Sequence, residues 1–246
     1  MKLSVQCYTL REEFARDPWG TFKALRAMGL NYVELAGTYG LSAQELKDGL
    51  DEIGLRVSGA HIGLAQLRSE LHRVIADAHT LENPYVILPW VGPPDYEQGW
   101  DVLAKECELI AQRLADAGLK FAYHNHDFEF ALQDGTPGLD VFYASSDPSL
   151  VLAQLDLYWI KAGGGDPEGY IRKYKKRVPL VHLKDMSAGE NPTFIEGGRG
   201  ILDWDGILAA CRDNNVEFGA IELDVCPNPP LESVRTSVEF FRGKGF

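Results

Sequence analysis

The chain has 246 residues, of which 45% are hydrophobic and 24% are charged, and its formal net charge is −12. This composition is typical of a soluble globular protein. The acidic excess argues against a nucleic-acid or anionic-membrane surface, because such surfaces are bound through excess Lys and Arg. No CxxC pair occurs, which indicates reduced thiols at the four cysteines, Cys7, Cys107, Cys211 and Cys226.

The N-terminal segment is typical of a first strand and not of a signal peptide, and no apolar run approaches the length of a membrane span. We therefore expect a cytoplasmic protein with one domain over residues 1–246. Its partner is expected to be a small molecule, with no nucleic acid and no membrane. The oligomeric state stays open, and a homodimer or a tetramer is compatible with the sequence.

Short apolar runs alternate with helical patterns along the whole chain. Asp17 and Pro18 are typical of a helix start, Ser42 is a second N-cap, and Gly29, Gly54 and Gly118 are typical helix stops. The expected strands are Leu3–Tyr8, Tyr32–Leu35, Leu55–His61, Tyr85–Trp90, Leu119–Tyr123, Val151–Leu157, Pro179–Leu183 and Glu217–Leu223. The expected helices are 18–28, 42–54, 71–81, 101–117, 139–145, 167–176, 204–214 and 233–241, and a long polar loop covers Lys184–Leu202.

Eight strands alternating with eight helices predict a single (β/α)8 TIM barrel of the α/β class. A doubly wound open sheet is the alternative. That fold would carry a glycine-rich nucleotide turn after its first strand, where this chain reads CYTLREE.

The fifth strand runs into the segment FAYHNHDFEF, residues 121–130. Strand alternation predicts His124 and His126 on one face and Asn125 and Asp127 on the other. A polar loop after a strand is the plain interpretation of this segment. Buried polar groups each need a partner, however, so this density of imidazoles and carboxylates favours a site with a metal.

Polar side chains also follow the late strands AQLDLYW, LVHLKD and AIELD. The carboxyl ends of barrel strands meet at one mouth, which is where catalytic residues of such barrels lie. The predicted metal ligands are Glu129, Asp156, His182 and Glu222. This set, mostly of oxygen donors, favours Mn²⁺, with Mg²⁺, Co²⁺ or Zn²⁺ possible.

These segments, together with VQCYTLR, AGGGDP and EGGRGILDW, make the chain resemble the xylose isomerase-like TIM-barrel superfamily, in its sugar phosphate isomerase/epimerase branch, which is related to inosose dehydratases. The resemblance implies one divalent ion held by residues of strands five to eight, three of them Asp156, His182 and Glu222. For strand five it leaves open whether Glu129 or an imidazole is the ligand. Trp159 stands where epimerases of the superfamily tend to have His.

The resemblance implies a metal-dependent sugar or sugar phosphate isomerase or epimerase that removes a proton next to a carbonyl. Glu222 is the expected base, with Glu129, His124 or His126 as its partner. The other expected substrate-binding residues, besides His126, are His61, Trp159, Lys184 and Arg199. A lyase, either an inosose-type dehydratase or an enzyme that eliminates from a keto-glycoside, is the alternative on the same site. A non-catalytic sugar-binding subunit is the third hypothesis, and the six histidines and acidic surface argue against a multi-zinc nuclease.

Overall fold

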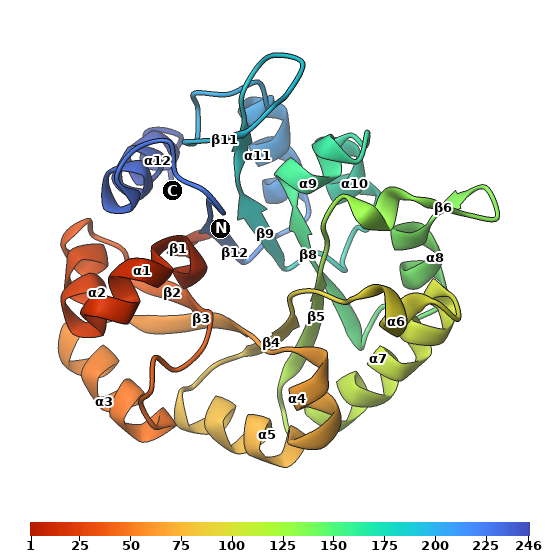
Figure 1. The fold of residues 1–246 in the computed structure, drawn as a ribbon, viewed down its shortest axis with the longest axis horizontal. Coiled ribbons are helices and arrows are strands. Elements are labelled where there is room, and N and C mark those ends of the chain that lie inside the picture. The colour runs from red at the N-terminus through yellow and green to blue at the C-terminus, as the bar shows by residue number, and fades with distance from the viewer.

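Eight parallel strands form the centre of the molecule and helices surround them (Figure 1). The computed structural model describes residues 1–246. The strands are β1 (Lys2–Val5), β2 (Tyr32–Leu35), β3 (Arg56–His61), β4 (Tyr85–Leu88), β5 (Lys120–His124), β8 (Val151–Asp156), β9 (Leu180–Leu183) and β12 (Phe218–Ile221). From β2 to β12 each barrel strand pairs with the next one along the chain, and β12 pairs with β1. An isolated bridge between Gln6 and Glu34 joins the end of β1 to β2. The predicted (β/α)8 barrel is confirmed.

The helices return the chain along the outside of the barrel, as expected for parallel strands. They are α1 (Arg11–Arg16), α2 (Pro18–Ala27), α3 (Ala43–Ile53), α4 (Leu64–Ser69), α5 (Leu71–Thr80), α6 (Pro93–Tyr96), α7 (Trp100–Asp116), α8 (Gly138–Ala144), α9 (Leu157–Ala162), α10 (Pro167–Lys173), α11 (Trp204–Asp213) and α12 (Pro230–Gly243). Two 3₁₀ turns, η1 (Cys7–Leu10) and η2 (Phe128–Phe130), follow β1 and β5. None of the helices combines the length and apolarity that a membrane span requires.

Local signals account for the ends of α2 and α3. The Asp17 carboxylate accepts a hydrogen bond from the Gly20 N–H, with Pro18 in the first turn of α2. Ser42 and Glu45 form a reciprocal capping box at the start of α3. Gly54 ends α3 with φ 82°, a left-handed conformation that favours glycine. The predicted starts of both helices are confirmed.

Several predicted boundaries are wrong. The fourth strand ends at Leu88, the sixth at Asp156 because Leu157 begins α9, and the last at Ile221, while the last helix begins at Pro230. The first strand ends at Val5, because residues 7–10 turn into η1. The loop 184–202 also contains an antiparallel pair, β10 (Asp185–Met186) and β11 (Phe194–Ile195). A second small pair, β6 (Leu132–Gln133) and β7 (Thr136–Pro137), follows η2. Such two-residue pairings depend on contacts made after the chain has folded back, so no periodic pattern of apolar residues in the sequence predicts them.

The two ends of the barrel differ in what fills them. Five apolar residues from four strands, Tyr85, Ile87, Ala122, Leu180 and Phe218, form a cluster separate from the main core of 61 residues. By alternation, Ala122 shares its strand face with His124, and Leu180 shares its face with His182. The small cluster therefore closes the barrel beneath the polar residues at the carboxyl ends of the strands.

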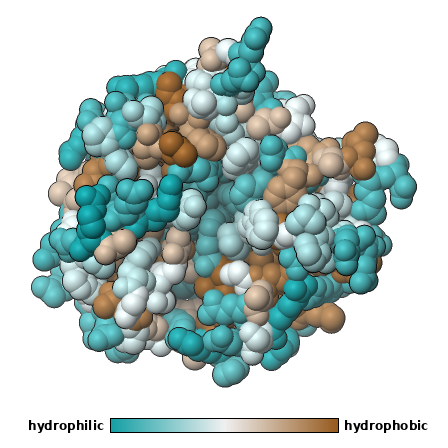
Figure 2. Space-filling model, viewed as in Figure 1, coloured by the Kyte–Doolittle hydropathy of each residue, from teal (hydrophilic) through white to brown (hydrophobic).

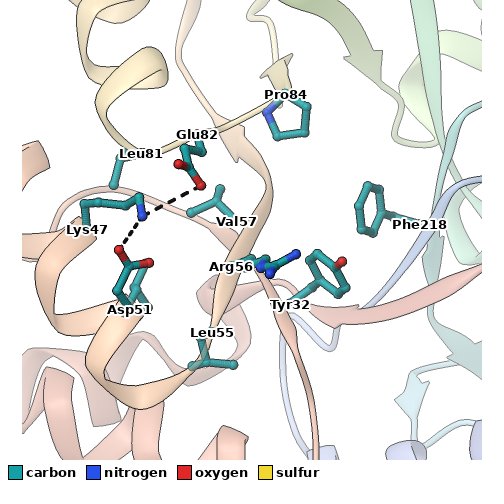
Figure 3. Close-up of a pocket in the computed structure, with 11 residues that line it drawn as sticks. Tyr32, Lys47, Asp51, Leu55, Arg56, Val57, Leu81, Glu82, Pro84 and Phe218 are labelled. Atoms are coloured by element: carbon teal, nitrogen blue, oxygen red, sulfur yellow. Dashed lines mark hydrogen bonds and ion pairs between the residues drawn. The ribbon is translucent and has the colours of Figure 1, made fainter.

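A cavity of about 350 Å³ opens at the amino-terminal ends of the strands. Tyr32, Arg56 and Phe218 line it, and Lys47 pairs there with Asp51 and with Glu82 (Figure 3). Both groups of His, Asp and Glu close enough to hold a metal lie elsewhere, at the opposite mouth. The residues that could hold a metal therefore lie at the carboxyl ends of the strands.

Candidate metal and substrate site

Four buried side chains converge where β5, β8, β9 and β12 end. One ligand atom from each of His124, Asp156, His182 and Glu222 lies within 4.8 Å of those of the other three. The parallel register explains part of this, because Asp156 pairs directly with His182 and His124 pairs with Gln154 two residues before Asp156. The structure thus brings together three of the four predicted ligands, with His124 as the fourth member.

Glu129 is not part of this cluster. It is fully buried, its Oε1 accepts a hydrogen bond from the Tyr123 hydroxyl (2.8 Å), and its Oε2 accepts one from the His126 N–H (2.9 Å). β5 ends at His124, and η2 turns the chain so that Glu129 folds back onto the strand and not onto the cluster. Burial raises the pKa of Glu129 to about 7 despite these two hydrogen bonds. Its role here is to hold the strand-five loop.

Glu34 holds His182 from inside the barrel. Glu34 Oε1 accepts hydrogen bonds from His182 Nε2 (2.7 Å) and from Gln6 (2.7 Å), and Oε2 accepts one from Gln154 (2.6 Å). On the other side of the ring, His182 Nδ1 lies 2.8 Å from Glu222 Oε2. The imidazole is therefore fixed between two carboxylates, the arrangement that sets ring orientation and tautomer in metal sites.

The protonation states follow from these contacts. Burial alone would lower the pKa of His182, but the charges of Glu222 and Glu34 outweigh it and raise the pKa to about 10. Burial alone would raise the pKa of Glu34, yet His182 and His61 hold it well below its ordinary value. At neutral pH an imidazolium thus lies between two ionised carboxylates.

Lys184 is buried in the same cluster. Its ammonium lies 3.0 Å from Asp156 Oδ2, 2.8 Å from Glu222 Oε2 and 2.7 Å from Asp224 Oδ2. Burial opposes the charged form, but these three carboxylates raise the pKa of Lys184 above its ordinary value. Burial likewise raises the pKa of Glu222, but Lys184 and His182 outweigh it and hold the pKa well below its ordinary value. The positive charge of Lys184 is therefore neutralised by carboxylates of the site itself.

The residues of the cluster fit a divalent cation. Four carboxylates, Glu34, Asp156, Glu222 and Asp224, face two cations, His182 and Lys184, so the formal charge of the group is 2 − 4 = −2. Asp156 is fully buried, and the nearest partner of its Oδ2 is the Lys184 ammonium at 3.0 Å. Burial raises the pKa of Asp156 and lowers that of His124 well below its ordinary value, so His124 is a neutral imidazole able to donate a lone pair.

Above the cluster, a cavity of about 500 Å³ opens at the mouth of the barrel. In the space-filling view the centre of this face is hollowed and hydrophilic atoms line the hollow (Figure 2). The lining residues are Tyr8, Ala36, Gly37, His61, Pro89, Trp90, His124, His126, Glu222 and Asp224.

Among the predicted substrate residues, His61 and His126 line this cavity and the other three do not. Trp159 lies behind His126, with ring centroids 5.5 Å apart. Arg199 is exposed on its loop, 3.7 Å from Glu196. Burial lowers the pKa of His126 to about 4, with a further contribution from the Lys184 charge, so its imidazole is neutral at the cavity wall.

The motif VHLKD divides its two charged residues between different tasks. Whereas Lys184 enters the cluster, Asp185 accepts hydrogen bonds from the N–H groups of Met186, Gly198, Gly200 and Leu202 and from the Trp204 indole. Asp185 therefore organises the EGGRG loop and does not reach the substrate space.

Some members of the site had no specific role assigned from the sequence. Tyr8, Glu34, Trp90 and Asp224 stand at strand ends and were expected at the mouth, Trp90 as an apolar wall with Trp159, but the contacts of Glu34 and the presence of Gln154 in the cluster were not predicted. One signal was available for two of them: YVEL and LAQLD each place a polar residue inside an apolar strand. A buried polar residue in a barrel strand needs a partner across the barrel.

A profile of the xylose isomerase-like TIM barrel family matches residues 22–244 of the chain. The chain belongs to this family. In barrels of this kind the catalytic residues lie at the carboxyl ends of the strands, which is where the cluster of this chain lies.

Individual relatives are more distant. An inosose dehydratase of Clostridium botulinum is 28% identical over 168 residues, which cover 60% of this chain and 55% of that protein. The chain thus spans only about half the length of such curated relatives. A sugar phosphate isomerase/epimerase of Parabacteroides distasonis superposes with a TM-score of 0.85 at 20% identity, over 98% of this chain and 97% of that one. A probable 3-DHS dehydratase of Bacillus anthracis superposes with a TM-score of 0.77 at 14% identity, over 98% and 99%. At these identities the two structures establish the fold alone.

Proposed function

We propose that the protein is a divalent-metal-dependent enzyme that removes the proton next to the carbonyl of a keto-sugar or keto-cyclitol. The observation that carries this proposal is the convergence of His124, Asp156, His182 and Glu222 on one point at the floor of the cavity, with one ligand atom of each within 4.8 Å of the others. These four residues would hold the ion. Two nitrogen and two oxygen donors suit Mn²⁺, Co²⁺ or Zn²⁺, and Mn²⁺ is the ion to test first.

A bound ion would stabilise negative charge on the carbonyl oxygen while the neighbouring carbon loses its proton. Glu222 is the proposed base. His182 and Lys184 both bind its Oε2, so Oε1 is the oxygen left to accept the proton, and Glu222 lines the cavity. His126, a neutral imidazole on the cavity wall, is a second proton acceptor within the site.

Dehydration is the favoured outcome after the proton is removed. In that reaction the substrate loses the α-proton and a β-hydroxide, together one water, and becomes an unsaturated ketone. Two observations support it: the sequence relatives named above are inosose dehydratases, and Glu129 lies outside the cluster, so Glu222 is the only glutamate that lines the cavity.

Isomerisation or epimerisation is the second candidate, and the two imidazoles beside Glu222 favour it. His124 and His126 have ring centroids 5.1 Å apart and both line the cavity. An imidazole there could return the proton to the opposite face or to the neighbouring carbon, which gives a stereoisomer or an isomer without loss of water.

The test uses protein reloaded with Mn²⁺ and keto-sugars or scyllo-inosose in heavy water. Deuterium uptake next to the carbonyl, followed by mass spectrometry, reports proton removal when the proton is returned to the substrate. A mass loss of one water reports it when the β-hydroxide leaves instead. Appearance of an ultraviolet band of a conjugated ketone identifies dehydration, and deuterium in a stereoisomer identifies epimerisation. Binding of these compounds without deuterium uptake and without loss of water would instead support a non-catalytic sugar-binding protein.

A further inference from the structure

The cavity at the mouth carries no cation free to bind a phosphate. Its charged lining residues are Glu222 and Asp224, both acidic. The nearby Lys184 is buried among three carboxylates, and Arg199 is on an exposed loop beside Glu196. The four carboxylates of the cluster outnumber the charges of Lys184 and of a divalent ion taken together, so a bound ion would leave no positive excess for a dianion.

Backbone N–H groups of glycine-rich loops are the other common phosphate ligands. In the AGGGDP segment, the N–H groups of Gly163, Gly164 and Gly165 donate to the carbonyls of Trp159, Lys161 and Ile160 and so complete the end of α9. These three donors have acceptors within the protein and are not available to a ligand.

The EGGRG loop is closed to phosphate in the same way. Gly198 and Gly200 donate their N–H groups to Asp185, at 2.9 Å and 3.0 Å, and Gly197 donates to the Ser237 hydroxyl. The Arg199 N–H donates to the Glu196 carbonyl. Both glycine-rich segments of the sequence therefore serve internal structure.

Two exposed aromatic side chains stand on the cavity wall instead. Tyr8, after β1, is 45% exposed and Trp90, after β4, is 55% exposed, although large aromatic residues are usually buried. A sugar or cyclitol ring has apolar C–H faces and hydroxyl edges, and such aromatic walls complement the faces. The imidazoles of His61 and His126 and the carboxylate of Asp224 can bind the hydroxyl edges.

We propose, building on the function above, that the cavity selects an uncharged polyhydroxylated ring, packed against Trp90 and Tyr8, and discriminates against sugar phosphates. Arg11 is the one nearby cation that could favour a phosphate. Its guanidinium stacks 4.5 Å from the Tyr8 ring, and Arg11 lines an adjoining cavity that shares Tyr8 and Ala36 with the cavity at the mouth. A phosphate group could reach Arg11 only from that side. Arg11 is therefore the residue with which to test the proposal.

The experiment measures binding to the Mn²⁺-loaded protein by calorimetry. The probes are scyllo-inosose and three pairs, each a ketose and its phosphate ester: fructose and fructose 6-phosphate, tagatose and tagatose 6-phosphate, xylulose and xylulose 5-phosphate. We expect scyllo-inosose or at least one ketose to bind, and every ketose that binds to exceed its ester by at least about tenfold, because the ester approaches two carboxylates. Trp90→Ala should weaken ring binding by about tenfold and Trp90→Phe should restore most of it.

Arg11→Gln is the control variant, because it removes the one nearby cation that a phosphate could reach. It should leave the affinities for uncharged rings and for esters within about twofold. Tighter binding of any ester than of its parent ketose, above all an advantage lost in Arg11→Gln, would overturn the proposal, as would the absence of binding by every uncharged probe. Uncharged rings that bind in the expected order without deuterium uptake and without loss of water would contradict the proposed function but leave the substrate preference standing.

Discussion

Replacing Glu129 by Gln tests whether this carboxyl group is a buried structural element, as the structure indicates, or a metal ligand. Glu129 is fully buried and its two oxygens accept from the Tyr123 hydroxyl and the His126 N–H. Gln can keep its carbonyl oxygen toward the His126 N–H and turn its amide toward the Tyr123 oxygen, which can act as an acceptor. The substitution thus removes the charge with little change in shape.

The magnitude follows from the pKa of Glu129, which burial raises from 4.5 to about 7. Because the folded state binds this proton more tightly than the unfolded state, the stability attributable to the group is fully present below pH 4.5 and is lost as the pH rises to about 7. The pKa difference corresponds to about 3 kcal/mol in the free energy of unfolding, at about 1.4 kcal/mol for each unit of pKa. Most of this loss, about 2–3 kcal/mol, falls between pH 5 and pH 8.

The assay is urea unfolding of metal-free protein at pH 5 and pH 8. Between these pH values the wild type should lose about 2–3 kcal/mol more than Glu129→Gln, or about 5–10 °C in melting temperature for a chain of this size. Asp127→Asn, which changes an exposed carboxylate two residues away, is the control and should behave as the wild type. Equal pH dependence of wild type and Glu129→Gln would refute the reasoning. So would a loss of Mn²⁺ binding in Glu129→Gln as complete as the loss we expect in Asp156→Asn.

Three further results are expected. Glu34→Gln should weaken Mn²⁺ binding by about 10–100-fold with the fold retained, because Glu34 orients His182; circular dichroism with a metal titration checks this, and unchanged affinity would contradict it. Mn²⁺ binding near pH 7.5 should release about one proton, since both nitrogens of His182 face carboxylates and an ion at Nδ1 displaces a proton. Calorimetry in buffers of different ionisation enthalpy measures the number of protons released, and a value of zero would argue against His182 as a ligand. Arg177→Met should destabilise the fold by about 3 kcal/mol without altering metal affinity, because the buried guanidinium donates to the carbonyls of Val151, Tyr143 and Ser146. Urea unfolding measures this loss, and a value below about 1 kcal/mol would show that water replaces those donors.

The order of elements and the end of the barrel that carries chemistry could be predicted from the sequence. Apolar runs bounded by glycine and by capping residues such as Ser42 encode strands and helices through local energetics, and these signals need no distant partner. Parallel strands then bring their carboxyl ends together whatever the details of packing. For that reason Asp156, His182 and Glu222, each at or just after the end of a different strand, could be grouped from the sequence.

The tertiary structure alone decided which polar residues meet. Glu34 and His182 are 148 residues apart and lie 2.7 Å from each other only because the barrel closes, and no spacing rule encodes a contact across a barrel. The turn after β5 likewise decided that His124 and not Glu129 joins the cluster. Glu129 lies in the 3₁₀ turn η2, where the alternation of a strand no longer predicts the direction of a side chain. Local pattern thus determines which groups reach the mouth of the barrel, and packing across the barrel determines which of them share a charge, a proton or an ion.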